Sequence, residues 1–435
     1  MTPTLPSPVS AGLADPSLLL TFVLLLVAPL LIAGVSLINT GLGRSRSAAQ
    51  ALLGNLAIVA VSAVVFALIG AAFTGSLPGG VGHTLHLAGK SWNWLGAGPL
   101  LLSGFGSAPA ASQLAVLFEF LAVAFTAIIP WGSGADRWQL IPGCVAAAVT
   151  SALLFPLFAH WVWGGGWLSQ LGVNFPPGAS FLDGGGAASV HVLGGLTALA
   201  VIWIAGPRKG KFPKGGFATA LPGHNAVYVL FGGLLALIGG MAWNVAGAVL
   251  WLHAPLSALP GTAVNTLLSA SGALVATFAI TRIRFGKPDA SLCANGGLAG
   301  LVASSACAGL ISPAAALFVG VVAGIITPLL VEVLELALSI DDPSGAITVH
   351  FVGGLWGLLA VGLFAPQAGQ FSAQLVGIAA LLGLALPLAY FLFALINRFV
   401  PFRVDPDGER IGMDLHELGG GAYPEFVIHR DESYR

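Results

Sequence analysis

The sequence predicts an all-α polytopic membrane protein with eleven transmembrane helices, from its composition, its apolar segments and the placement of its basic residues. Of its 435 residues, 57% are hydrophobic and only 8% are charged, whereas a soluble domain carries about 25% charged residues. So few charges cannot cover a water-facing surface, and we expect lipid to surround most of the protein. The 60 glycines suit transmembrane helices, which approach one another through small residues.

Eleven apolar segments are each long enough to cross a bilayer, which takes about 20 residues in a helix. We expect them near 17–40, 49–74, 110–132, 138–163, 185–206, 225–250, 261–283, 292–311, 313–339, 346–365 and 373–398. No Lys or Arg precedes the first of these runs at Leu18. The start therefore lacks the basic region of a secretory signal, and we expect a retained helix.

The sixteen basic residues predict the orientation of these helices. Every one of them except Lys90 follows an odd-numbered segment. Because basic loops stay on the cytoplasmic side, the N-terminus is expected outside and the C-terminus inside a cell membrane, plasma or bacterial inner. One missed or invented helix would scramble this pattern, so it also supports the number of segments.

The chain contains an internal repeat. One copy reads DGGGAASVHVLGGL from Asp183, and the other reads DDPSGAITVHFVGGLW from Asp341. When Asp183 is aligned with Asp342, both copies have a Gly three residues after the Asp and a Val-His pair whose His lies eight residues after it. Gly-Gly-Leu then follows in both. The copies fall at helices five and ten. Since a repeat of five helices must invert, the sequence predicts two inverted five-helix repeats plus an eleventh helix.

The repeat divides the chain into two expected regions. Residues 1–399 form a transmembrane domain, with repeat one at about 17–206, repeat two at about 225–365 and the extra helix at about 373–398. Residues 400–435 form a cytoplasmic tail.

His191 and His350 occupy equivalent places in the two copies. A histidine inside a membrane segment is rare and faces a bundle interior or a pore. A single one would equally fit a hydrogen bond that locks two helices, but two symmetric ones, each followed by Gly-Gly, favour a pore. Two neutral imidazoles can bond to each other and still offer a donor and an acceptor. That suits a small solute that sheds water and does not suit a hydrated metal ion.

Several segments resemble the Amt/Rh family of ammonium transporters. They are the two repeat copies, WVWGGGWL at 161–168, HNAVYV from His224, NGGLAGLVA from Asn295, SPAAALFVGVVAGII from Ser312 and the tail GMDLHELGGGAYPE from Gly412. The resemblance covers nearly the whole chain. Trp163 and the tail favour the Amt branch over the Rh branch.

The resemblance implies a homotrimer with one pore per subunit. Ammonium would be recruited at an outer vestibule, lose a proton before or during passage, and pass the twin histidines as ammonia. Asp183 would be needed at the outer end of the pore, where we expect it to cap helix five more than to touch the cation. The tail could dock a PII-class regulatory protein. No cofactor, metal or nucleic acid is implied, and membrane lipid is the expected surrounding.

The outer vestibule departs from the family pattern. Phe118 retains one gate ring and Trp163 retains the cation–π partner. The other aligned positions differ: the third-helix gate falls at Ala122, the second gate ring becomes Trp243, and the vestibule serine becomes Gly247.

Glu119 stands where the family has a neutral glutamine. A carboxylate inside a membrane helix is costly and needs a reason. One interpretation is that Glu119 supplies the cation attraction that Gly247 no longer gives. The other is that it pairs within the trimer or lies in the outer headgroup region.

Two rival functions remain open beside ammonium transport. The fold could serve as a receptor that binds ammonium and reports through its tail, although we expect no kinase or cyclase domain fused after the tail. It could also admit another small solute, such as methylamine or urea, because Ala122 widens the entrance. We expect no enzyme, since the sequence has no nucleophile–base arrangement and no cofactor loop.

Overall fold

The computed structural model describes residues 15–176, 178–214 and 216–423. Within these residues, eleven helical segments are long and apolar enough to span a membrane, which confirms the predicted number. They are Pro16–Leu42, Ser45–Thr74, Ala110–Ser133, Leu140–Val162, Ala187–Ala205, Ala226–Trp251, Leu256–Phe285, Ala290–Cys307, Pro313–Leu336, Ile347–Phe364 and Gln370–Phe399. The protein is a multi-pass membrane protein.

Several spans combine two helices or a helix and a π-helical turn. The helices are α1 (Asp15–Val27), α2 (Pro29–Leu42), α3 (Ala48–Val65), α4 (Ala71–Thr74), α5 (Ala110–Ser133), α6 (Leu140–Val149), α7 (Phe155–Val162), α8 (Leu171–Asn174), α9 (Leu193–Ala205), α10 (Ala226–Trp251), α11 (Leu259–Phe285), α12 (Ala290–Cys307), α13 (Pro313–Leu336), α14 (Gly353–Phe364), α15 (Gln370–Ala380), α16 (Leu386–Phe399) and α17 (Pro406–Ile411). The π-helical turns η5 (Ala187–Val192) and η7 (Ile347–Val352) precede α9 and α14.

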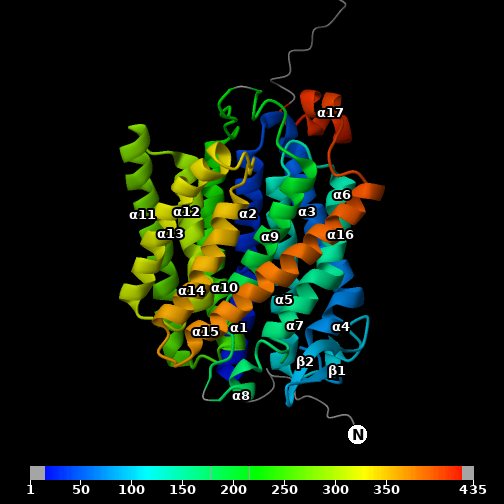
Figure 1. Ribbon diagram of the computed structural model, residues 1–435, viewed down its shortest axis with the longest axis vertical. Coiled ribbons are helices and arrows are strands. Elements are labelled where there is room, and N and C mark those ends of the chain that lie inside the picture. Colours follow the sequence, from blue (N-terminus) through cyan, green and yellow to red (C-terminus); the bar gives the residue numbers. More distant parts are fainter. Residues whose placement is uncertain (1–14, 177, 215, 424–435) are drawn as a thin grey trace, which may run out of the picture.

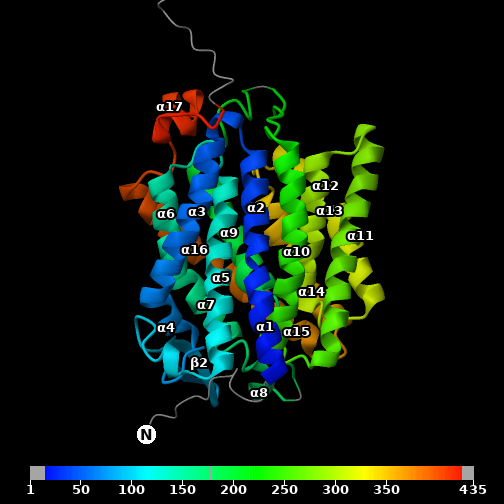
Figure 2. The same ribbon diagram turned by 180° about the vertical axis from the view of Figure 1, so that it is seen from behind.

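The helices form one bundle with two distinct ends (Figure 1). The hairpin end carries the strands β1 (Val81–Leu87) and β2 (Lys90–Ala97), and the tail end carries α17. The α15–α16 span crosses the bundle obliquely on one side, while α1, α2 and α10 lie on the opposite side (Figure 2).

The hairpin is an element that the all-α prediction missed. Strands β1 (Val81–Leu87) and β2 (Lys90–Ala97) pair antiparallel across a two-residue turn. Both turn residues, Ala88 and Gly89, have positive φ, as a hairpin of this length requires. The ring of Trp94 in β2 stacks on Trp167, 5.3 Å between centroids. This contact fixes the hairpin to the loop that follows α7.

The two predicted repeats pack so that equivalent helices meet. Span one packs on span six through α2 and α10, and span five packs on span ten through η5 and α14. At the hairpin end, Trp163 Nε1 donates to the Asp183 carbonyl just before η5 (2.8 Å). At the tail end, Ser133 Oγ donates to Asp342 just before η7 (2.8 Å). Spans five and ten therefore run in opposite directions, as the inverted repeat predicts.

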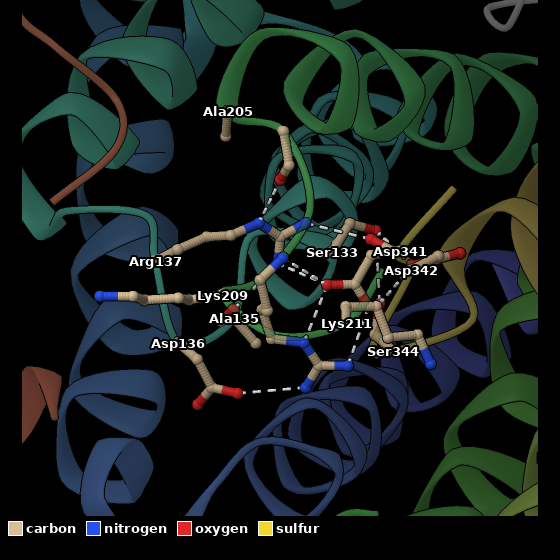
Figure 3. Close-up of polar contacts among 12 residues, drawn as sticks. Ser133, Ala135, Asp136, Arg137, Ala205, Lys209, Lys211, Asp341, Asp342 and Ser344 are labelled. Atoms are coloured by element: carbon tan, nitrogen blue, oxygen red, sulfur yellow. Dashed lines mark hydrogen bonds and ion pairs between the residues drawn. The ribbon is translucent and has the colours of Figure 1, made fainter. Parts of the chain in front are cut away.

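A buried ion network joins the loops at the tail end (Figure 3). Arg208 donates through Nε and Nη2 to both carboxylate oxygens of Asp341 (3.0 and 2.9 Å) and through Nη1 to Asp136 (3.1 Å). Arg137 donates to the backbone oxygens of Gly206 (2.7 Å) and Asp341 (3.0 Å). These bonds tie three loops together next to the start of η7.

The network sets the charge state of its buried members. Burial lowers the pKa of Arg137 to about 10, an effect that Asp341 opposes. Burial by itself would raise the pKa of Asp341, but hydrogen bonds from Arg208 and the charge of Arg137 hold it below its ordinary value. Both groups are therefore ionised at neutral pH, and the network is a set of paired charges.

Candidate functional site: a histidine pair beneath an aromatic entrance

The two predicted histidines lie side by side in the middle of the bundle. His191 is in η5 and His350 is in η7, and their Nδ1 atoms are 3.1 Å apart. The rings are nearly parallel, with an interplanar angle of 9°. One Nδ1 must donate and the other must accept, so the pair keeps one free Nε2–H donor and one free Nε2 acceptor.

Each histidine turn is held by an aspartate at its start. Asp183 Oδ2 accepts from the backbone N–H of Ala188 (3.2 Å) and Ser189 (2.9 Å), and from the Ser189 hydroxyl (2.9 Å). Asp342 Oδ2 accepts from the Ile347 N–H (2.7 Å). A carboxylate at a helix start stabilises the free N–H groups there. This geometry fits the capping role expected of Asp183.

Glycines after each histidine allow the two turns to approach. A Cβ at Gly195 would lie 2.6 Å from Phe351, the residue after His350. A Cβ at Gly354 would lie 2.7 Å from Val192, the residue after His191. The contacts are reciprocal, so the second glycine of each Gly-Gly pair serves the turn of the other repeat. Without them the histidines could not come within hydrogen-bonding distance.

Phe125 of α5 covers the histidine pair and was missed in the sequence. Its ring meets His191 and His350 edge to face, with centroids 5.1 and 5.9 Å apart. Phe125 follows Phe118 by seven residues, a spacing that returns to the same helix face. That periodicity was the signal in the sequence that could have found it.

Four aromatic residues lie between Phe125 and the hairpin end. Phe118 contacts Trp243 at 4.3 Å and Trp163 at 5.6 Å between centroids. Trp251 stacks on Trp163 at 4.9 Å and 9°. Trp251 was also missed, although it follows Trp243 by eight residues on the same face of α10.

Trp243 occupies the space beside Ala122, where the family pattern has the ring of a gate residue. Ala122 is buried on α5 between Phe118 and Phe125. The Trp243 ring lies 4.3 Å from Phe118 and 6.2 Å from Phe125, and its Nε1 donates to the Gly185 carbonyl (2.6 Å). The loss of one ring at Ala122 and the gain of a larger one at Trp243 therefore compensate, so the entrance is not widened by a full ring.

Gly247 lies where the backbone before η5 approaches α10. A Cβ at this position would be 2.2 Å from the Gly184 carbonyl oxygen and 3.1 Å from the Gly185 Cα. The absence of a side chain therefore follows from packing, because any Cβ would push the loop that leads to His191.

Glu119 lies on a different face of α5 from the aromatic residues. It is completely buried, and its two oxygens accept from the hydroxyls of Thr74 (2.9 Å) and Ser76 (2.6 Å). Consecutive residues in a helix point about 100° apart, so Glu119 diverges from its neighbour Phe118. It links α5 to the end of span two inside the subunit, an arrangement that neither interpretation from the sequence described.

Comparison with known proteins shows which family this chain belongs to. The profile of the Ammonium Transporter Family matches residues 18–423. The chain belongs to the ammonium transporter family. It is 33% identical to the ammonium transporter Amt2 of Archaeoglobus fulgidus, over 96% of this chain and 91% of that protein. It is 27% identical to the ammonium transporter of Bacillus subtilis, over 91% and 95%.

Two solved structures share the fold of this chain. A sensor Amt protein superimposes with a TM-score of 0.83 and 26% identity, covering 92% of this chain and 98% of that one. Mep2 of Candida albicans superimposes with a TM-score of 0.74 and 24% identity, covering 96% and 92%. These relatives confirm the resemblance and the fold. The family is one of transporters and not of enzymes, as the sequence predicted.

Proposed function

We propose that the chain moves ammonium across the membrane as ammonia, through a pore lined by His191 and His350. Family membership and fold support ammonium transport. The observation that carries the finer proposal is the buried Nδ1–Nδ1 bond of 3.1 Å between two symmetric imidazoles. Ammonia is both a donor and an acceptor, so it matches the free Nε2–H and Nε2 lone pair of that pair.

The aromatic entrance accounts for the first step of this proposal. Ammonium meets the aromatic rings at the entrance, where a cation is attracted to the ring quadrupole. Phe118, Trp243 and Phe125 then separate the entrance from the histidines. An ion cannot keep its water among these rings. Before or during passage, ammonium therefore gives its proton to water at the entrance or to the free Nε2 acceptor of the histidine pair, and it continues as neutral ammonia.

We place the hairpin end outside the cell and the tail inside, in the plasma or bacterial inner membrane. Arg137, Arg208 and Arg403 gather at the tail end, whereas Lys90 lies in the hairpin, which follows the positive-inside rule. Residues 1–399 form the transmembrane domain and 400–435 the tail. We also propose a homotrimer with one pore per subunit and a PII-class regulator at the tail, both from family membership.

Uptake into liposomes tests the function. Purified protein is reconstituted, and ammonium is compared with methylamine, potassium and urea. We expect ammonium and methylamine to pass and potassium and urea to be excluded. Equal passage of urea would favour the wider-solute alternative.

A receptor is the second candidate, because one solved relative is named a sensor Amt protein. Calorimetric binding of ammonium to the same preparation separates the two. A protein that binds ammonium in detergent but passes none in liposomes is a receptor, and the transport proposal then fails.

A further inference from the structure

Trp251 is the outermost ring of the aromatic entrance. It ends α10, eight residues beyond Trp243, which places it about 12 Å further along the helix axis. Phe118, Trp163 and Trp243 are buried, whereas Trp251 is partly exposed. A cation arriving from the hairpin end therefore reaches Trp251 before the other rings.

The stacking of Trp251 on Trp163 covers one face of the Trp163 ring. Trp251 lies parallel to it at 4.9 Å and 9°, and Phe118 and Phe155 meet it edge-on at 5.6 and 6.3 Å. Only 4% of Trp163 is exposed. A cation–π contact needs the ion over an open ring face, and Trp163 has no such face while Trp251 covers it.

Trp251 is the one partly exposed ring among these four aromatic residues. Its ring contacts among the described residues are the stack on Trp163 and the edge-on contact with Phe118 at 5.8 Å. The stack on Trp163 accounts for one face of the Trp251 ring. The second face has no aromatic neighbour among the residues that the structure describes.

The nearby carboxylates offer no exposed binding group. Glu119 is completely buried and both of its oxygens accept from hydroxyls. Asp183 is only 2% exposed, with Oδ2 capping η5 and Oδ1 buried without a hydrogen-bond partner among the described residues. Gly247 brings no hydroxyl. An aromatic face is thus the group left to attract a cation.

We propose that Trp251 is a specificity-determining residue that presents the first cation-binding face for ammonium or methylammonium, in the place of Trp163. This inference rests on the proposed function. It makes the entrance selective for small cations that lie over the indole face, over anions and over neutral solutes that gain nothing from the ring quadrupole.

Four variants test the assignment. Trp251→Phe keeps a π face; Trp251→Leu and Trp251→Met still cover Trp163 but have none; Trp251→Ala uncovers Trp163. We expect apparent affinity for ammonium to fall about five- to thirtyfold in the Leu and Met variants, the range of a cation–π contact. Phe should stay close to wild type, and Ala should fall between Phe and Leu because Trp163 regains an open face.

Affinity is measured both by calorimetry and by methylammonium uptake, with Trp203→Leu as the matched control. Trp203 is half exposed on α9 and lies away from the entrance, so its variant should keep wild-type affinity. Wild-type affinity in folded Trp251→Leu or Trp251→Met protein would overturn the role of Trp251 while leaving transport intact. Absence of wild-type uptake would instead overturn the transport proposal, and calorimetry would still decide the role of Trp251.

Discussion

At Gly247, the hydroxyl expected from the family pattern is missing because the Gly184 carbonyl occupies the space of a side chain. The same close approach lets Trp243 Nε1 reach the Gly185 carbonyl at 2.6 Å. Single substitutions at the entrance are therefore coupled: the small residue on α10 and the large indole one turn earlier belong to the same packing arrangement.

Gly247→Ser tests this coupling. A Cβ only 2.2 Å from a backbone oxygen forces the loop before η5 to move, and overpacking of this kind costs about 1–3 kcal/mol. We expect a lower melting temperature and slower ammonium uptake, instead of a gain from the added hydroxyl. Gly233→Ala on the same helix is the control, because its Cβ would meet its nearest neighbour at 3.8 Å. Faster uptake by the serine variant would show that the loop has room.

Glu119 is the second residue whose role the contacts redefine. With both oxygens bonded to Thr74 and Ser76, it joins two helices. We expect Glu119→Gln to keep the ammonium affinity of wild type, because the hydroxyls can rotate to bond an amide. Glu119→Leu leaves the two hydroxyls without their acceptor and should destabilise the protein by about 1–3 kcal/mol. Thermal unfolding in detergent and calorimetric titration give the two readouts, and a large loss of affinity in the glutamine variant would restore the cation-attraction hypothesis.

At the scale of elements, the tail caps helices that are far away in sequence. Asp414 accepts from the backbone N–H of Ala49 (3.2 Å) and Gln50 (2.8 Å) at the start of α3. Glu417 accepts from the Leu140 N–H (2.9 Å) at the start of α6. A carboxylate at a helix start pairs with free N–H groups and with the positive end of the dipole. The tail is thereby fixed to two spans of the first repeat.

Asp414→Ala should loosen the tail. Loss of a cap costs about 0.5–2 kcal/mol, so we expect faster cleavage of the tail by a protease and a small fall in melting temperature. Asp407→Ala is the matched control, since its side chain is 87% exposed. Equal cleavage rates in wild type and the Asp414 variant would mean that the caps do not hold the tail.

At the scale of the whole molecule, the ion network of Figure 3 fixes the tail-end loops against the start of η7. Asp341 is central, because Arg208 bonds both of its oxygens and Arg137 approaches within 3.9 Å. Removing one partner of a buried pair costs about 3–5 kcal/mol, since the other charge is left unpaired. The network therefore links global stability to the placement of His350.

The network predicts an acid-dependent loss of stability. The folded-state pKa of Asp341 lies below its ordinary value. Its contribution to the free energy of unfolding is therefore complete above the unfolded pKa of about 3.9, and it is lost as the pH falls through the lower folded-state pKa. Asp342 has the opposite effect on the pH dependence of stability, because burial raises its folded-state pKa above the ordinary value. Asp341→Asn should lower the melting temperature at pH 7 and flatten its fall below about pH 4. Parallel pH curves for the variant and wild type would exclude Asp341 as the cause.

The sequence by itself determined the eleven spans and the symmetric pair His191 and His350, because apolar length and an internal repeat are local patterns. Only the tertiary structure decided how the entrance is built. Trp251 covers Trp163, Glu119 binds hydroxyls at the end of another span, and a β-hairpin packs on α4 and α7. Each of these contacts depends on which residues from distant segments meet. Packing between segments that are distant in sequence sets these contacts, and no local sequence pattern specifies them.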